Sequence, residues 1–112
     1  MYGITNCSTV KKARNWLESN KIDYEFWDYK KQGIDESHLI RWCDYFGWEK
    51  VLNRSGMMWR KADEETKNKV VNQVTAIEFM ISTPTAIKRP ILESGEKLLL
   101  GFDDGEYNDL KN

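Results

Sequence analysis

The first thirty residues alternate between β-type and helical spacing of apolar side chains. Residues 1–4 are apolar and β-leaning, and they predict a short strand followed by a polar loop. Apolar residues then recur at helical spacing and predict a helix over 8–19, with Asn20 as its stop signal. Residues 22–29 alternate apolar and polar side chains, which predicts a strand with one buried face.

The middle of the chain is predicted to be helical. Gly33 breaks the pattern, and Asp35 is a suitable cap for a helix over 36–46. The apolar stripe of this helix consists of Leu39, Trp42, Cys43 and Phe46. Residues 47–62 mix aromatic and basic side chains without a clear period. Since tryptophans at this density usually pack, and the net charge is near zero, we favour a packing role over nucleic-acid stacking here.

The remaining residues predict a last helical stretch and a hairpin. The helix runs from Asp63 to about residue 69, then continues or restarts through Ser82, and Pro84 ends it. Its predicted core face consists of Val70, Val74, Ile77 and Ile81. Two short strands over 91–93 and 97–101 surround Ser94-Gly95, a hairpin signature, and a brief helix is predicted from Asp103.

The order of these elements predicts an α/β fold. A β-α-β start implies two parallel strands with a crossover helix, and the final pair of strands implies an antiparallel hairpin. We therefore expect a thioredoxin-like mixed sheet flanked by helices, with a helical insertion between its two halves. The chain is expected to form a single domain, residues 1–112, with the thioredoxin-like core at about 1–29 and 83–112 and the insertion at about 30–82.

Composition narrows the class of protein. The 112 residues are 40% hydrophobic and 12% aromatic, which suits one folded domain. Seventeen basic and eighteen acidic residues give a net charge of −1, so no nucleic acid or membrane partner is expected. No secretory signal or membrane helix is recognisable. One histidine and two separated cysteines exclude a convincing zinc site, so we expect a cytoplasmic monomer with free thiols and no bound metal or cofactor.

Cys7 is the strongest candidate for chemistry because it lies between the first strand and the first helix. Backbone N–H groups and the helix dipole at such a position favour the thiolate. Lys11 adds positive charge one turn later, and the hydroxyls of Ser8 and Thr9 are candidate hydrogen-bond donors to the sulfur. The alternative is a buried cysteine that only packs between the first strand and the first helix. The polar neighbours, including Asn6, favour the reactive interpretation.

Two arginines are candidates for binding an anion near the sulfur. Arginine donates planar, bidentate hydrogen bonds and does not titrate, although most surface arginines are only solvated. Arg54 lies in the mixed stretch, and Arg89 precedes Pro90, an X-Pro bond that could be cis beside a site. Cys43 belongs to an apolar helical stripe, so it is expected to pack rather than react. The single histidine, His38, is expected on the surface.

Several segments in this order and spacing resemble the ArsC/Spx family, which includes glutaredoxin-coupled arsenate reductases and Spx-type regulators, and the likeness is closest to the YffB-like branch. They are YGITNCSTVKKARNWL, DYEFWDYKKQGID, GWEKVLNRSG, STPTAIKRPIL and LLLGF. The resemblance implies a thioredoxin-like fold with a helical insertion and makes Cys7 the catalytic cysteine. It also makes Arg54 and Arg89 the first and second site arginines, and Pro90 a cis-proline.

Two positions depart from the pattern of this family. Some members carry a CxxC motif where this chain has Val10 in place of the second cysteine, which excludes an internal disulfide there. Arsenate reductases of this type carry a third arginine beyond the hairpin, where this chain has Leu100-Gly101-Phe102. The second departure weakens arsenate as a substrate.

The sequence therefore predicts a single-cysteine thiol reductase that acts on an oxyanion or an oxidised thiol. Without a local second cysteine, an external thiol must complete the cycle, and glutathione or glutaredoxin is the expected partner. The predicted binding residues around Cys7 are Asn6, Ser8, Thr9, Lys11, Arg54, Arg89 and Pro90. The alternative is a non-enzymatic, Spx-like regulator that binds RNA polymerase. The physiological substrate and the thiol donor stay open.

Overall fold

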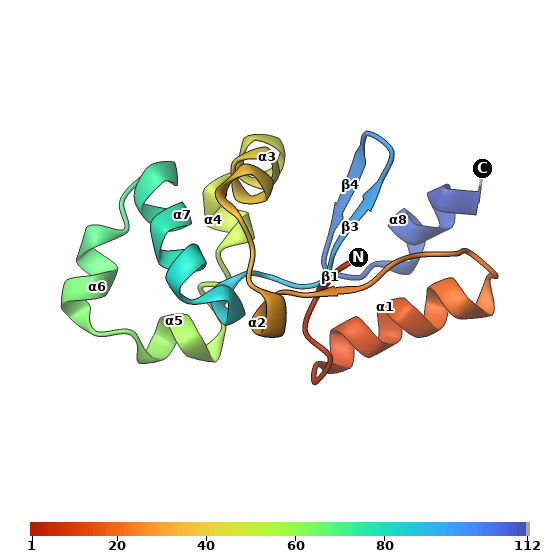
Figure 1. Ribbon diagram of the computed structural model, residues 1–112, viewed down its shortest axis with the longest axis horizontal. Helices are drawn as coiled ribbons and strands as arrows, with labels where there is room; N and C mark the ends of the chain where they lie inside the picture. The colour runs from red at the N-terminus through yellow and green to blue at the C-terminus, as the bar shows by residue number, and fades with distance from the viewer. Residues whose placement is uncertain (112) are drawn as a thin grey trace. The chain divides into compact units, whose positions relative to one another are not determined.

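The structure is a computed structural model that describes residues 1–111 (Figure 1). The chain divides into two compact units. Unit 1 comprises Met1–Gln32 and the chain from Arg89 onward, and unit 2 comprises Gly33–Lys88. No helix in the described residues has the length and apolar character needed to cross a bilayer.

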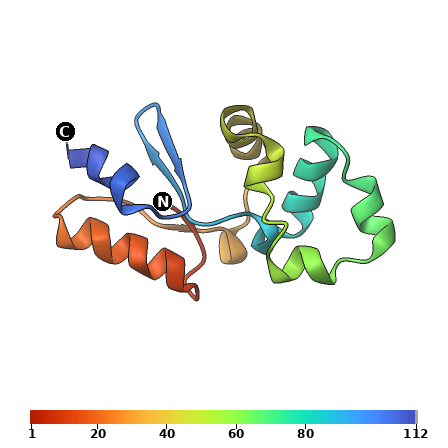
Figure 2. The ribbon, with the colours of Figure 1, turned by 180° about the vertical axis from the view of Figure 1, so that it is seen from behind.

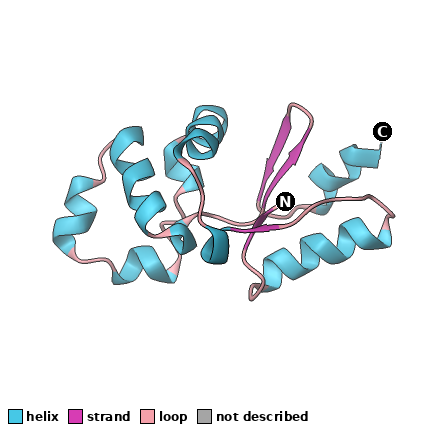
Figure 3. Ribbon diagram, in the orientation of Figure 1, coloured by secondary structure: helices cyan, strands magenta, loops and turns pink. Residues whose placement is uncertain are grey.

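Unit 1 contains the strands. Its elements are β1 (Tyr2–Gly3), α1 (Ser8–Ser19), β2 (Trp27–Asp28), α2 (Tyr29–Gln32), β3 (Ile91–Ser94), β4 (Lys97–Leu100), α8 (Asp104–Asn108) and the 3-10 helix η2 (Asp109–Lys111). The strands form a four-stranded sheet in the order β2-β1-β3-β4 (Figure 3). β1 is parallel to β2, and the other neighbouring pairs are antiparallel. The α/β class and the mixed, thioredoxin-like sheet are thus as predicted.

The core of unit 1 forms between α1, the hairpin β3–β4 and α8. Val10, Ala13 and Leu17 are three and four residues apart on α1 and are almost completely buried. They pack with Leu92 and Leu99 of the hairpin and with Tyr107 of α8. Helix α1 begins at Ser8 and ends at Ser19, as its apolar spacing predicts, and Asn20 caps its C-terminus.

The strand predicted over 22–29 is much shorter in the structure. Only Trp27–Asp28 pair with β1, and residues 22–26 belong to no strand. The alternation nevertheless has its predicted effect, because Ile22, Tyr24 and Phe26 pack against the core. The helix α2 already starts at Tyr29, since the Asp28 carboxylate accepts the backbone N–H groups that begin it.

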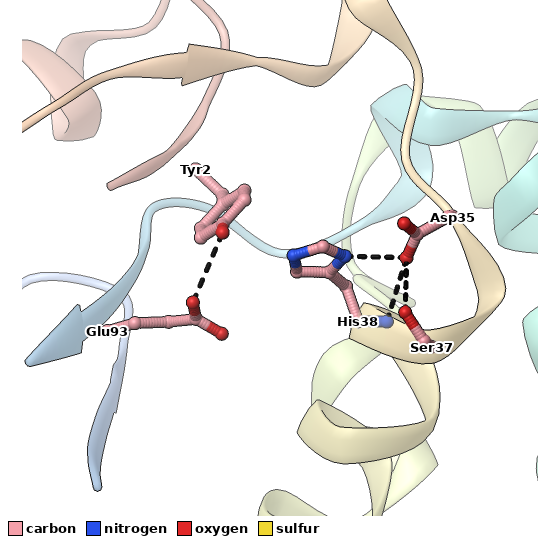
Figure 4. A network of polar contacts seen from close by, with 5 residues as sticks. All are labelled: Tyr2, Asp35, Ser37, His38 and Glu93. Carbon is pink, nitrogen blue, oxygen red and sulfur yellow. Dashed lines mark hydrogen bonds and ion pairs between the residues drawn. The ribbon is translucent and has the colours of Figure 1, made fainter. Parts of the chain in front are cut away.

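The hairpin and the last helix follow the predicted pattern. Register pairs Ser94 with Lys97, so the two-residue turn is Gly95-Glu96, one position later than predicted. Gly95 has φ +61°, a conformation that glycine adopts without strain. Asp103 caps α8 by accepting the N–H of Glu106. On the face of β3 opposite the core residue Leu92, the Tyr2 hydroxyl donates a hydrogen bond to the Glu93 carboxylate at 3.1 Å (Figure 4).

Unit 2 is helical in the described residues. Its elements are α3 (Glu36–Phe46), α4 (Trp48–Val51), α5 (Met57–Lys61), α6 (Glu64–Lys69), α7 (Gln73–Ser82) and the 3-10 helix η1 (Pro84–Ala86). Helices α3, α4 and α7 pack on one another, as Figure 2 shows from behind. Leu39, Trp42 and Cys43 form the buried stripe of α3, as predicted, whereas Phe46, the fourth predicted member, is only half-buried.

Side chains at the starts of helices fix the boundaries in unit 2. The Asp35 carboxylate accepts the backbone N–H of His38 at 3.0 Å and thereby caps α3, as predicted. The same carboxylate contacts the His38 ring and the Ser37 hydroxyl (Figure 4). At α7, Asn72 and Thr75 form a capping box. The ambiguous prediction for this stretch is thus settled, because the helix restarts at Gln73.

The predicted core face of α7 is partly wrong. Ile77 is buried, but Val74 is 66% exposed and Ile81 is 41% exposed. Ala76 and Met80 are buried instead. Because the chain breaks after α6, α7 takes a new rotational phase, and the continuous stripe expected from Val70 onward does not form.

Candidate functional site

Cys7 is the N-cap residue of α1. Its backbone is extended, with φ −151° and ψ 125°, and its carbonyl accepts the N–H of Lys11. The short β1 delivers the chain into this position through an exposed loop at Thr5 and Asn6. The side chain is half-buried, and no acidic residue lies in the first turn of α1. The sulfur therefore faces the positive end of a helix dipole.

The surroundings of Cys7 favour the thiolate. Burial raises the pKa of the thiol, but hydrogen bonds from the Val10 N–H, the Arg89 side chain and the Thr9 N–H outweigh it. The positive charge of Arg89 acts in the same direction. The net effect is a pKa below the ordinary value of cysteine. The groups of α1 that lower this pKa are the Val10 and Thr9 backbone amides, and hydrogen bonds from the hydroxyls of Ser8 and Thr9 to the sulfur stay predictions.

Arg89 reaches the sulfur because of how β3 pairs. Tyr2 of β1 is opposite Ile91 of β3, and the two strands are antiparallel, so the residues before β3 lie beside the end of β1. Arg89 thus contacts the loop that carries Cys7. The Arg89–Pro90 peptide bond is cis, as the family resemblance implied, and Pro90 is buried.

The structure adds two residues that the sequence did not single out. Asp28 and Tyr29 follow each other where β2 ends, and they are 7% and 0% exposed. The Asp28 carboxylate accepts the backbone N–H groups of Lys30 and Lys31 and lies 3.5 Å from the Thr5 hydroxyl. Tyr29 interacts with both Arg89 and Cys7. For Asp28, the signal available in the sequence was an acidic residue directly before a possible helix start, and for Tyr29 there was no such signal.

The other predicted residues around Cys7 lie near it along the chain. Asn6, Ser8 and Lys11 are exposed, and Thr9 is half-buried. Apart from the Thr9 backbone amide, their parts in binding stay predictions.

Arg54 belongs to unit 2 and is described there by itself. It is exposed, follows α4, and its guanidinium lies 5.9 Å from the centre of the Trp48 ring. Its predicted role in anion binding also stays a prediction.

The second cysteine has the properties of a packing residue. Cys43 is 2% exposed in α3. Burial, with the negative charges of Asp44 and Glu49, raises the pKa of its thiol to about 11. The contrast between the two cysteines is chemical: Cys43 is held as the thiol, and Cys7 is shifted toward the thiolate.

Comparison with known proteins identifies the family of this chain. The family model described as ArsC family matches residues 2–110. A solved structure described as the YFFB protein is 49% identical, with a TM-score of 0.92, and the match covers 96% of this chain and 94% of that one. An arsenate reductase (ArsC) related protein from Brucella melitensis is 45% identical, with a TM-score of 0.74 and coverage of 96% and 89%.

A more distant relative is a regulator. The global transcriptional regulator Spx 1 of Lactococcus lactis is 23% identical over 109 residues, which cover 95% of this chain and 83% of that protein. The family model, the two solved structures and the fold agree with the resemblance seen in the sequence. The chain belongs to the ArsC family.

Proposed function

We propose that this protein is a single-cysteine thiol reductase that uses glutathione as its electron donor. The observation that carries the proposal is the environment of Cys7. Cys7 is a half-buried cysteine at the N-terminus of α1, and the Thr9 and Val10 amides together with Arg89 lower the pKa of its thiol. These are the conditions that activate a cysteine nucleophile.

The proposed reaction with a disulfide substrate proceeds in three exchanges. The Cys7 thiolate attacks one sulfur of the substrate, forms a mixed disulfide and releases the other sulfur as a thiolate. A first glutathione thiolate then displaces the second half of the substrate and remains bound to Cys7. A second glutathione attacks this disulfide, regenerates the Cys7 thiolate and leaves as oxidised glutathione. Two glutathiones thus supply the two electrons that reduce one substrate disulfide.

The need for an external thiol follows from the two cysteines of the chain. Val10 occupies the position at which a CxxC motif would carry its second cysteine. Cys43 is buried and held as the thiol at neutral pH, so it is a poor nucleophile for a disulfide on Cys7.

The positively charged side chains of Arg89 and Arg54 are the basis for the proposed substrate class. Arg89 offers a fixed guanidinium at the sulfur for an oxyanion or for a carboxylate of glutathione. Arg54 is proposed as a second such group. Since Leu100-Gly101-Phe102 occupies the position of the third arginine of arsenate reductases, we favour an oxidised thiol over arsenate.

A coupled assay tests this proposal. The protein is supplied with glutathione, NADPH, glutathione reductase and a small mixed disulfide, and NADPH oxidation is followed. Cys7→Ser is expected to abolish protein-dependent turnover, whereas Cys43→Ser, the matched control, retains it. Turnover that survives Cys7→Ser would overturn the proposal.

The relationship to Spx 1 supports a second candidate, a regulator that binds RNA polymerase. Absence of turnover with disulfides and with arsenate, together with stoichiometric binding to purified RNA polymerase, would favour that function instead.

A further inference from the structure

Tyr29 lies at the same end of the sheet as Arg89. β1 is the strand between them, because Gly3 pairs with Asp28 on one side and Tyr2 pairs with Ile91 on the other. Continuing the register by one residue on the β2 side and by two residues on the β3 side places Ile4 between Tyr29 and Arg89. The two side chains therefore flank the end of the strand that leads to Cys7.

Arg89 acts on both Cys7 and Tyr29. Its side chain, by hydrogen bonding and by its positive charge, lowers the pKa of the Cys7 thiol and opposes the rise in the pKa of the Tyr29 hydroxyl. A guanidinium carries five N–H donors in a fixed plane, so it serves two acceptors at once without competition. A guanidinium held at a second point has fewer orientations available, and its contact with the sulfur is correspondingly better defined.

The surroundings keep Tyr29 neutral and fixed. Tyr29 is completely buried, and burial raises its pKa far above the ordinary tyrosine value although the charge of Arg89 opposes the shift. Its neighbour Asp28 accepts the N–H groups of Lys30 and Lys31, which fixes the backbone at the start of α2. The charged groups that act on Tyr29 are Arg89, Cys7 and Asp28.

We propose that Tyr29 is a positioning residue whose buried hydroxyl orients the Arg89 guanidinium toward the Cys7 sulfur. The inference rests on the proposed role of Cys7 as the nucleophile. It assigns to α2 a function that the sequence pattern, which predicted Tyr29 as the end of a strand, did not reveal. Tyr29 acts through Arg89 and does not itself contact the substrate.

The test is a titration of the thiol in the Cys43→Ser protein, with no glutathione or substrate present. The rate constant of iodoacetamide alkylation is measured from pH 5 to pH 10. Tyr29→Phe, which removes only the hydroxyl, is expected to lower the rate at pH 6 by about threefold to tenfold, or about half to one pKa unit. Tyr107→Phe is the matched control, because Tyr107 is equally buried in unit 1 and is expected to leave the titration unchanged.

A double-mutant cycle with Arg89→Gln separates positioning from general structural effects. In the Arg89→Gln protein, Tyr29→Phe is expected to change the Cys7 titration by less than about 0.2 pKa units. The proposal is overturned if Tyr29→Phe leaves the pKa unchanged or lowers it, or if its effect persists without Arg89. Because the titration uses no substrate, failed turnover with an intact Tyr29 effect would reject only the proposed function.

Discussion

Gly3 of β1 leaves little space for a side chain beside Val10 of α1, and replacing Gly3 tests this packing. A Cβ atom added at Gly3 would lie 3.0 Å from Val10 Cγ2 and 3.7 Å from Phe26 Cε1. The first distance is well below ordinary van der Waals separation, and Val10 is completely buried. The Val10 side chain or α1 itself must therefore shift in Gly3→Ala.

The expected change in the free energy of unfolding is the sum of two opposing contributions. Overpacking of a core costs about 1–3 kcal/mol, and alanine in place of glycine within a strand returns about 0.5–1 kcal/mol. Gly3→Ala is thus expected to lower the free energy of unfolding by about 1 kcal/mol. Val10→Ala removes two methyl groups and leaves a cavity, which costs about 2.5 kcal/mol. In the double variant the added methyl fills part of that cavity, so the total loss is expected to be about 2 kcal/mol.

Urea denaturation of the parent, the two single variants and the double variant measures these free energies. The predicted coupling between the two positions is about 1.5 kcal/mol. Losses that add to within about 0.5 kcal/mol would refute the reasoning, because they would show that the two positions do not contact each other.

Contacts of single side chains give three further expectations. Asn72→Ala should lower the free energy of unfolding by about 1 kcal/mol, because Asn72 caps α7, whereas the exposed Asn68→Ala should change it by less than about 0.5 kcal/mol in urea denaturation. Tyr107→Phe should raise it by about 1 kcal/mol, since the buried hydroxyl has no hydrogen-bond partner within residues 1–111; a loss would contradict this. Hydrogen bonds from the side chain and N–H of His38 lower the pKa of Asp35 to about 2, so its stabilisation is present at neutral pH and is lost as the pH falls toward 2. The stability difference between the parent and Asp35→Ala should therefore shrink at pH 2, and an undiminished difference would contradict the assignment.

Helices with local signals could be predicted almost to the residue. α1 and α3 each combine apolar spacing with a clear start or stop, such as Asp35, and both occur as predicted. The signals act over one or two turns, so neighbouring residues suffice to read them. The rotational phase of α7 could not be read in the same way. It depends on whether the chain restarts at Asn72, and the sequence left both possibilities open.

The chemistry of the site was partly accessible from sequence. Cys7 was recognisable because its environment is mainly local, consisting of the amides of the helix that it precedes. Arg89 was recognisable only as a candidate, and family resemblance strengthened it. Tyr29 was missed because its contact with Arg89 depends on β1 pairing with strands more than sixty residues apart along the chain. The spacing of residues along the sequence does not reveal a contact between residues so far apart.

The central claim is that Cys7 is an activated nucleophile, and its thiol pKa tests this most directly. Alkylation of Cys43→Ser by iodoacetamide as a function of pH reports Cys7 alone. We predict an apparent pKa below about 8.5, the ordinary value for cysteine, and faster alkylation at pH 6 than that of an unstructured cysteine peptide. An apparent pKa at or above that of the peptide would contradict the account.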